Sequence, residues 1–212
     1  MGEKRESPVV ETVAAVIASA LGASWLHPLL NSVGNELQNE QARRVSLALR
    51  AAERLSGASR EELAERIAAN REGVNQLIRL LYLAGWNGHD ETLEMMGRCL
   101  VRGLEAVEEG DQERAAQEEA ILDSLHMLTP RHVRMLAIIQ GTPGIANGPL
   151  ADAVEPWDVY PDRTAGELLA RGLVKDPYGM LAGGDRERRF HTISPLGALL
   201  IRAAEEVALL DL

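Results

Sequence analysis

The feature that most constrains the fold is the helical spacing of apolar residues, which runs through the first 128 positions. In the clearest stretch these residues recur every three or four positions, at Leu93, Met96, Leu100, Val101, Leu104 and Val107. That spacing places them on one face of a helix. Aromatic residues make up only 3% of the chain, so the core has to be built mostly from Leu, Ala, Val and Ile. We therefore predict a mainly α protein.

Local signals predict where the helices of this part begin and end. Ser59-Arg60-Glu61-Glu62 is a capping box, whose hydroxyl and carboxylate each accept a hydrogen bond from a free backbone N–H group. Gly57 and Gly110 each follow a run of apolar positions, where glycine commonly ends a helix. We predict helices at about Asn35 to Leu55, around Leu63 and Ile67, over Val74, Leu77, Ile78 and Leu81 to Gly85, from Leu93 to Glu109, and from Asp111 to Met127.

The pattern changes at Thr129. Thr129-Pro130 opens a helix, and residues 140–149 form a connection rich in Gly and Pro. Tyr178–Ile193 holds two short apolar runs around Gly183-Gly184-Asp185, which predicts a β-hairpin. Further helices are expected at 150–154, at 164–171 and from Leu196 onward. We predict a helical domain and a second domain ordered helix, helix, helix, hairpin, helix, at residues 1–128 and 129–212.

Three elements of the second domain carry a family resemblance. They are a leucine-rich third helix that ends in Gly-Leu-Val, an arginine-tipped hairpin and the start of the closing helix: Leu168, Leu169, Gly172, Leu173 and Val174, then Arg186, Arg188 and Arg189, then Thr192-Ile193-Ser194-Pro195-Leu196-Gly197. Together they span about residues 129–205 and resemble MarR-like regulators. The resemblance implies a winged helix-turn-helix whose wing is the hairpin. Winged helices also serve as protein-binding modules.

A second resemblance spans about Asn70 to the end of the chain. A paired-helix segment is followed by Leu125-His126-Met127-Leu128-Thr129-Pro130 and then by the winged-helix elements. This arrangement is similar to the Abi-alpha family, which is linked to phage exclusion. The chain departs from that family's pattern at two positions, because Thr129 stands in place of Ser and His132 stands where the family tends to carry Asp. The resemblance implies a role in defence.

The formal net charge of −10 bears on nucleic-acid binding, because phosphates repel an acidic chain unless its cations are clustered. Residues 1–128 carry 13 basic and 21 acidic side chains, whereas residues 129–212 carry 9 and 11. We predict that the nucleic-acid contacts are arginines of the third helix and the wing, Arg163, Arg171, Arg186, Arg188 and Arg189. The same helix region also presents acidic groups that oppose DNA, Asp158, Asp162 and Glu167.

Signals for catalysis or metal binding are weak. Cys99 is the only cysteine, and its apolar helical surroundings indicate a small buried side chain. His126 and His132 are six residues apart across Pro130, unlike the i, i+4 pair of a helical zinc site, so we interpret them as unpaired surface or core histidines. Gly141-Thr142-Pro143-Gly144 lacks the Gly-Lys-Ser/Thr of a phosphate loop. We expect no enzyme activity, no catalytic residue, no metal and no cofactor.

The stretch Thr12–Asn35 carries no formal charge and is long enough for a membrane span to be considered. Ala, Ser and Gly dominate it, so its free energy of membrane insertion is marginal. We favour a helix over Val9–Leu30 that packs on protein, with a membrane-associated or targeting segment as alternatives. We predict a cytoplasmic protein that forms homo-oligomers through its N-terminal helices.

Two functions remain open. The first is a DNA-binding regulator of winged-helix type, in which the wing arginines and the helix at 164–171 contact double-stranded DNA while the N-terminal helices dimerise. The alternative is an adaptor or phage-defence component, in which the winged helix binds a protein partner and makes no direct DNA contact. The salt dependence of DNA affinity distinguishes them, because contacts between cations and phosphates weaken with salt.

Overall fold

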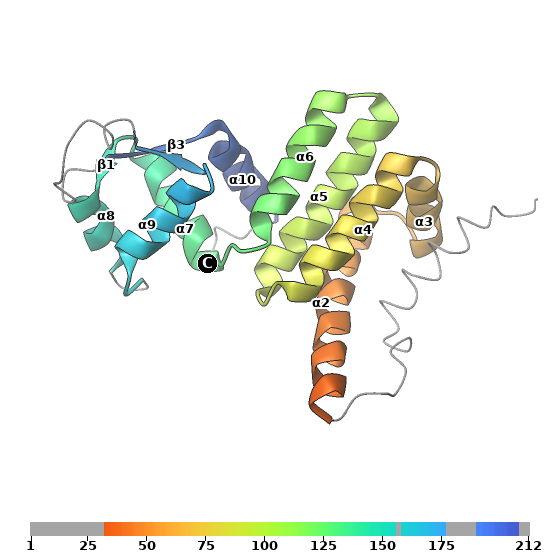
Figure 1. Cartoon of the computed structure of the whole chain (residues 1–212). Coiled ribbons are helices and arrows are strands. Elements are labelled where there is room, and N and C mark those ends of the chain that lie inside the picture. Colours follow the sequence, from red (N-terminus) through yellow and green to blue (C-terminus); the bar gives the residue numbers. More distant parts are fainter. Residues whose placement is uncertain (1–31, 156–157, 177–189, 208–212) are drawn as a thin grey trace, which may run out of the picture. The chain divides into compact units, whose positions relative to one another are not determined.

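The structure is a computed structural model, and it describes residues 32–155, 158–176 and 190–207. Within these ranges the protein is mainly helical, as predicted, with one small antiparallel sheet of three strands (Figure 1). The chain divides into two compact units, Met1–His126 and Met127–Leu212. The sequence pattern itself changes after residue 128. The helix expected over Val9–Leu30 lies outside the described residues.

The described part of the first unit consists of the helices α2 Ser32–Ser56, α3 Arg60–Ala68, α4 Arg71–Trp86, α5 Asp90–Glu109 and α6 Gln112–Leu125. The predicted capping box is present, because Ser59 Oγ accepts a hydrogen bond from Glu62 N at 3.2 Å and Glu62 Oε2 accepts one from Ser59 N at 2.7 Å. Gly57 and Gly110 adopt positive φ angles of 64° and 75° after α2 and α5, a conformation that favours glycine. The helices predicted for this part of the chain are confirmed to within a few residues.

Helix α5 lies at the centre of the first unit and packs against α2, α4 and α6. Its buried residues include Leu93, Met96, Leu100 and Leu104. Gly97 sets the closest approach, since an added Cβ atom would lie 2.2 Å from the carbonyl oxygen of Ala48 and 2.9 Å from the Ala51 Cβ atom. A side chain does not fit there, so the α2 and α5 backbones lie in direct contact.

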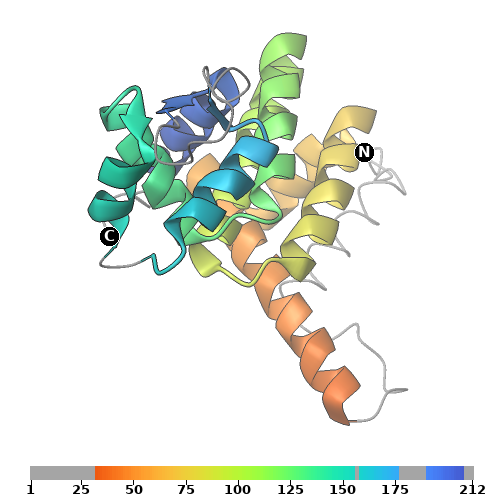
Figure 2. The ribbon, with the colours of Figure 1, turned by 60° about the vertical axis from the view of Figure 1, so that its left-hand side comes forward.

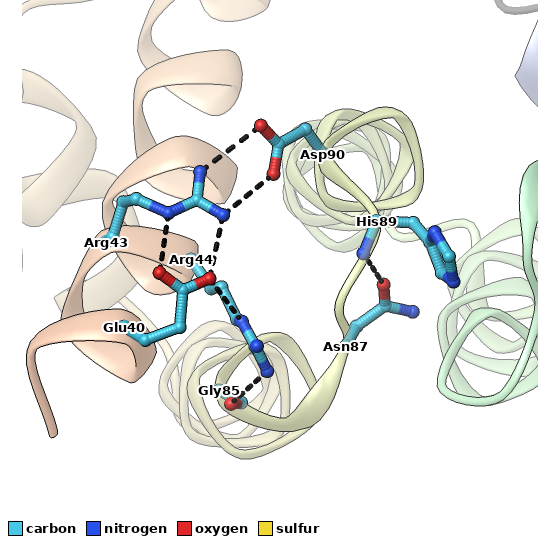
Figure 3. A network of polar contacts seen from close by, with 7 residues as sticks. All are labelled: Glu40, Arg43, Arg44, Gly85, Asn87, His89 and Asp90. Atoms are coloured by element: carbon cyan, nitrogen blue, oxygen red, sulfur yellow. Dashed lines mark hydrogen bonds and ion pairs between the residues drawn. The ribbon is translucent and has the colours of Figure 1, made fainter. Parts of the chain in front are cut away.

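Polar contacts fix α2 against the junction of α4 and α5 (Figure 3). Arg43 Nη2 lies 2.8 Å from Glu40 Oε1 and 3.0 Å from Asp90 Oδ1, and Arg44 Nη1 donates to the Gly85 carbonyl at 3.4 Å. Hydrogen bonds from Arg43, and then from Arg44, lower the pKa of Glu40 to about 2. The Arg43 pairs remain half exposed, so they add little free energy of folding and mainly set geometry.

Asn87 joins this junction to the end of α6. The side chain is buried, and its Nδ2 donates to the Leu125 carbonyl at 2.9 Å. Its Oδ1 accepts from His89 N at 2.9 Å (Figure 3). The amide thus satisfies backbone groups of the α4–α5 turn and of the last turn of α6. The turn and the helix end are held together by one side chain.

The second unit places a small sheet among helices. Its elements are α7 Pro130–Gly141, β1 Ile145–Ala146, α8 Asn147–Val154, α9 Pro161–Ala170, β2 Val174–Lys175, β3 Phe190–Ile193 and α10 Pro195–Glu206. The strand order is β1-β3-β2, and both pairings are antiparallel, with Ile145 opposite His191 and Val174 opposite Ile193. Helix α10 starts against β2, because an added Cβ atom at Gly197 would lie 2.2 Å from the Leu173 carbonyl oxygen.

The strands differ in part from the predicted hairpin. Strand β3 lies within the expected range Tyr178–Ile193, but β2, the strand before it in the chain and one of its two partners, begins earlier, at Val174. The reason is the turn at Gly172, whose φ of 68° sends the chain from α9 directly into the sheet. The remainder of the expected hairpin, residues 178–189, lies outside the described residues.

We expect Gly97→Ala to destabilise the first unit by about 1–3 kcal/mol, because the added methyl group overlaps the Ala48 carbonyl. Gly85→Ala is the matched control: Gly85 is also buried in a helix, yet its Cβ would meet no atom within 4 Å. This control should gain up to about 1 kcal/mol from helix propensity. Denaturant unfolding measures both values. Equal stabilities of the two variants would contradict the close α2–α5 contact.

Candidate functional site

Helix α9 is the element that the sequence predicts to meet a partner. Its side chains Thr164, Ala165 and Leu168 are buried against the rest of the second unit. Asp162, Arg163, Gly166 and Ala170 are exposed on its outer face. The helix therefore presents small and charged side chains, with two carboxylates and one guanidinium along its whole length.

The guanidinium of this helix is paired within the helix. Arg163 Nε donates to Glu167 Oε1 at 2.9 Å, although the Arg163 side chain is 73% exposed. Hydrogen bonds from Arg163, and then from His132, lower the pKa of Glu167. A carboxylate at this distance offsets the positive charge that a phosphate would otherwise meet.

His132 ties α9 to the start of α7. Its Nδ1 accepts a hydrogen bond from Thr129 N at 3.1 Å, which assigns the ring proton to Nε2, and Nε2 lies 2.8 Å from Glu167 Oε2. The ring is 1% exposed, and burial lowers its pKa in spite of Glu167. The interpretation of His132 as an unpaired histidine is wrong. The ring closes the N-terminal turn of α7 and also bonds α9 through the Glu167 carboxylate.

The turn before α9 differs from the prediction as well. Asp158, expected among the acidic groups presented to a partner, is 2% exposed, and its Oδ1 accepts a hydrogen bond from Tyr160 N at 3.0 Å. The carboxylate is used inside the turn, in the way that Asp side chains commonly stabilise such turns. Its neighbours are exposed instead, Val159 by 81% and Tyr160 by 65%.

The predicted nucleic-acid contacts are only partly described. Arg163 lies in the first turn of α9, and Arg171 is the residue that ends the helix, half buried. The two are eight positions apart, which is roughly 12 Å along a helix. Lys175, on β2, is exposed and was not predicted. Arg186, Arg188 and Arg189 lie outside the described residues.

The first unit contains an open cleft of about 540 Å³ beside α4, lined by Glu72, Gln76, Ile78, Arg79, Tyr82, Val107, Ala115, Ala116 and Glu119, among others. Its guanidinium is occupied, since Arg79 contacts Glu119 and lies 2.6 Å from Asp123. Among the described residues, no group of three or more His, Cys, Asp or Glu side chains is placed to hold a metal ion.

Cys99 lies in the core of the first unit, as predicted. Burial is the main cause that raises the pKa of its thiol, and Glu118 adds to it. The thiol therefore stays protonated and poorly nucleophilic. The neighbouring Arg98 and Glu118 form a buried ion pair between α5 and α6, with each side chain 9% exposed. These three residues support packing in the core.

Two features of these surfaces were not predicted. The link between His132 and Glu167 joins residues 35 positions apart, and no periodicity signals such a contact. The exposed residues Val159 and Tyr160 follow the turn residue Asp158. This position after a turn is the one sequence signal that their side chains lie outside the core. In the part of the chain that the structure describes, no helix is long and apolar enough to cross a membrane.

Comparisons with protein-family models, with curated proteins and with solved structures gave no match to this chain.

We expect the stability of the second unit to fall as pH drops below 6.5, the ordinary histidine value. Because the pKa of His132 is lowered in the folded protein, the unfolded chain takes up a proton at this residue first, and protonation favours unfolding. His132→Gln keeps a capping-box partner for Thr129 and a donor for Glu167, but does not titrate. Unfolding free energies between pH 7.5 and 5.5 should therefore fall more for the wild type. Parallel pH profiles would contradict the buried neutral ring.

Proposed function

We propose that the second unit is a winged-helix module that binds a protein partner through the α8–α9 turn and the outer face of α9. The element order from α7 to α10 and the strand order β1-β3-β2 support this type of module. Exposed Val159 and Tyr160, directly before α9, carry the proposal. Exposed apolar and aromatic groups with a polar rim are typical of protein interfaces.

Charge supports a protein partner over DNA. A groove-reading helix needs cations that are free to meet phosphates. In α9 the Arg163 guanidinium is held by Glu167, and Asp162 is exposed beside it. In the turn that precedes the helix, the exposed residues Val159 and Tyr160 add apolar and aromatic surface and carry no positive charge. A partner with a complementary apolar patch and a basic rim fits this face best.

Binding of double-stranded DNA is the second candidate function. The observation that favours it is the cluster Arg186, Arg188 and Arg189, which falls in the sequence between the paired strands β2 and β3, where a wing would lie. Arg171 and the exposed Lys175, which precede this cluster in the chain, would add further cations. In this case the wing, rather than α9, would supply most of the phosphate contacts.

We expect the double variant Val159→Ser with Tyr160→Ser to bind the protein partner with an affinity lower by roughly tenfold or more, as when an interface hot spot is removed. Arg202→Ala, at an exposed position on α10, is the control and should retain the partner. Affinity capture from host extract, with and without nuclease, measures retention. A partner that disappears after nuclease treatment, or that the double variant still retains, would contradict the proposal. Thermal unfolding checks that both variants fold.

The DNA candidate is tested by the salt dependence of duplex binding. Replacing Arg186, Arg188 and Arg189 by Ala should lower the slope of log affinity against log salt by ~0.9 for each phosphate that the triple variant no longer binds. The protein-binding proposal expects no duplex binding by the wild type at moderate salt. Salt-sensitive binding that the triple variant loses, and that Val159→Ser/Tyr160→Ser keeps, would establish the DNA function in its place.

A further inference from the structure

An apolar stripe runs along the outer face of α4. Ile78, Tyr82 and Trp86 follow one another at intervals of four residues and are exposed by 60%, 65% and 57%. The opposite face of the same helix is buried through Leu77, Leu80, Leu83 and Ala84. Helix α4 is therefore apolar on two sides, and Ile78, one of the apolar positions from which this helix was predicted, lies on the outer side. A helix with a second apolar face normally packs against a second element.

The stripe is large for an uncovered surface. Two aromatic rings and an isoleucine at this exposure present on the order of 400 Å² of apolar area, the size at which exposed patches mark a contact. The open cleft beside it adds the apolar side chains of Val107, Ala115 and Ala116. The stripe spans about two turns of α4, roughly 12 Å, and the small side chains of Ala115 and Ala116 beside it leave room for an apolar helix.

We propose that the segment Val9–Leu30 of the same chain docks on this stripe. Within it, Val13, Val16, Ile17, Ala20 and Leu21 recur at helical spacing, and no formal charge occurs from Thr12 to Asn35. The uncharged face of this segment matches the α4 stripe of Ile, Tyr and Trp. A charged face would lose the hydration of its charges when it is buried on that stripe. The segment is covalently joined to α2, so its docking has a high effective concentration and no cost of bimolecular association.

The geometry of α2 brings the segment within reach. The bond from Arg44 to the Gly85 carbonyl places residue 44 level with the C-terminal end of α4. From Ser32 to Arg44 the helix rises by roughly 18 Å, and both views show its first turns extending beyond α4 and α5 (Figures 1 and 2). From Gly85 back to Ile78 is roughly a further 10 Å. A chain that reverses near Pro28 and continues as a helix to Val9 covers roughly 29 Å, enough to reach Ile78.

Engineered cysteine pairs test the docking in the full-length chain. On this geometry Val13 lies level with Tyr82, so Val13→Cys/Tyr82→Cys treated with a bifunctional maleimide should give an intramolecular cross-link at monomer mass. Val13→Cys/Glu61→Cys is the control, because Glu61 is exposed in the first turn of α3 and is not part of the stripe. Cys99 is buried, and the unmodified protein treated in parallel accounts for it. Absence of the first cross-link, or its appearance only at dimer mass, would overturn docking in the same chain; the second result would identify a second copy as the occupant.

Fluorescence of Trp86 gives an independent readout. With Trp25 and Trp157 replaced by Phe, Trp86 should be shielded from iodide, and Ile17→Asp should increase its quenching severalfold. Ser19→Asp places the same charge off the apolar face of the segment and should leave quenching unchanged. Equal quenching in the parent, Ile17→Asp and Ser19→Asp proteins would overturn the proposal. Far-ultraviolet circular dichroism checks that each variant keeps its helices.

Discussion

Helices α2 and α5 meet where Gly97 lies against the carbonyl group of Ala48, and the other contacts of the first unit depend on this approach. With the two backbones in contact, the opposite faces of α5 remain free to pack on α4 and α6. The same approach brings Arg43 within reach of Asp90 at the start of α5. A chain with few aromatic residues fills its core in this way, by close helix contacts between small residues rather than by large side chains.

The helices were predictable because their signals are local. The spacing of Leu93, Met96 and Leu100 fixes a helix, and the Ser59 capping box and Gly110 fix two of the ends, without reference to distant residues. The strands were harder to predict, since β1 and β2 have two residues each and an alternating pattern needs more. The Gly172 turn, not the apolar pattern, determines where β2 begins.

The surfaces were less predictable, because exposure depends on what the rest of the chain covers. Ile78 has the spacing of a core residue, yet it lies on the outer face of α4 with Tyr82 and Trp86. Asp158 carries a charged side chain of the kind usually found on the surface, yet it is buried in a turn. Arg163 was predicted to contact DNA. The sequence does not show that Glu167 accepts a hydrogen bond from Arg163 and also contacts His132. Net charge alone therefore misjudges the electrostatic character of α9.

The bond between His132 and Glu167 also has a consequence for how the sequence can vary over evolution. Loss of Glu167 alone leaves a buried ring nitrogen without its partner, and loss of His132 alone leaves Thr129 N without its side-chain acceptor and Glu167 Oε2 without its donor. Each single change is therefore costly, whereas a joint change removes both partners of the His132–Glu167 bond and leaves only Thr129 N without its side-chain acceptor. Positions 132 and 167, far apart in the chain, should covary as a pair among related proteins, and the substitutions accepted at α9 should depend on which residue occupies the first turn of α7.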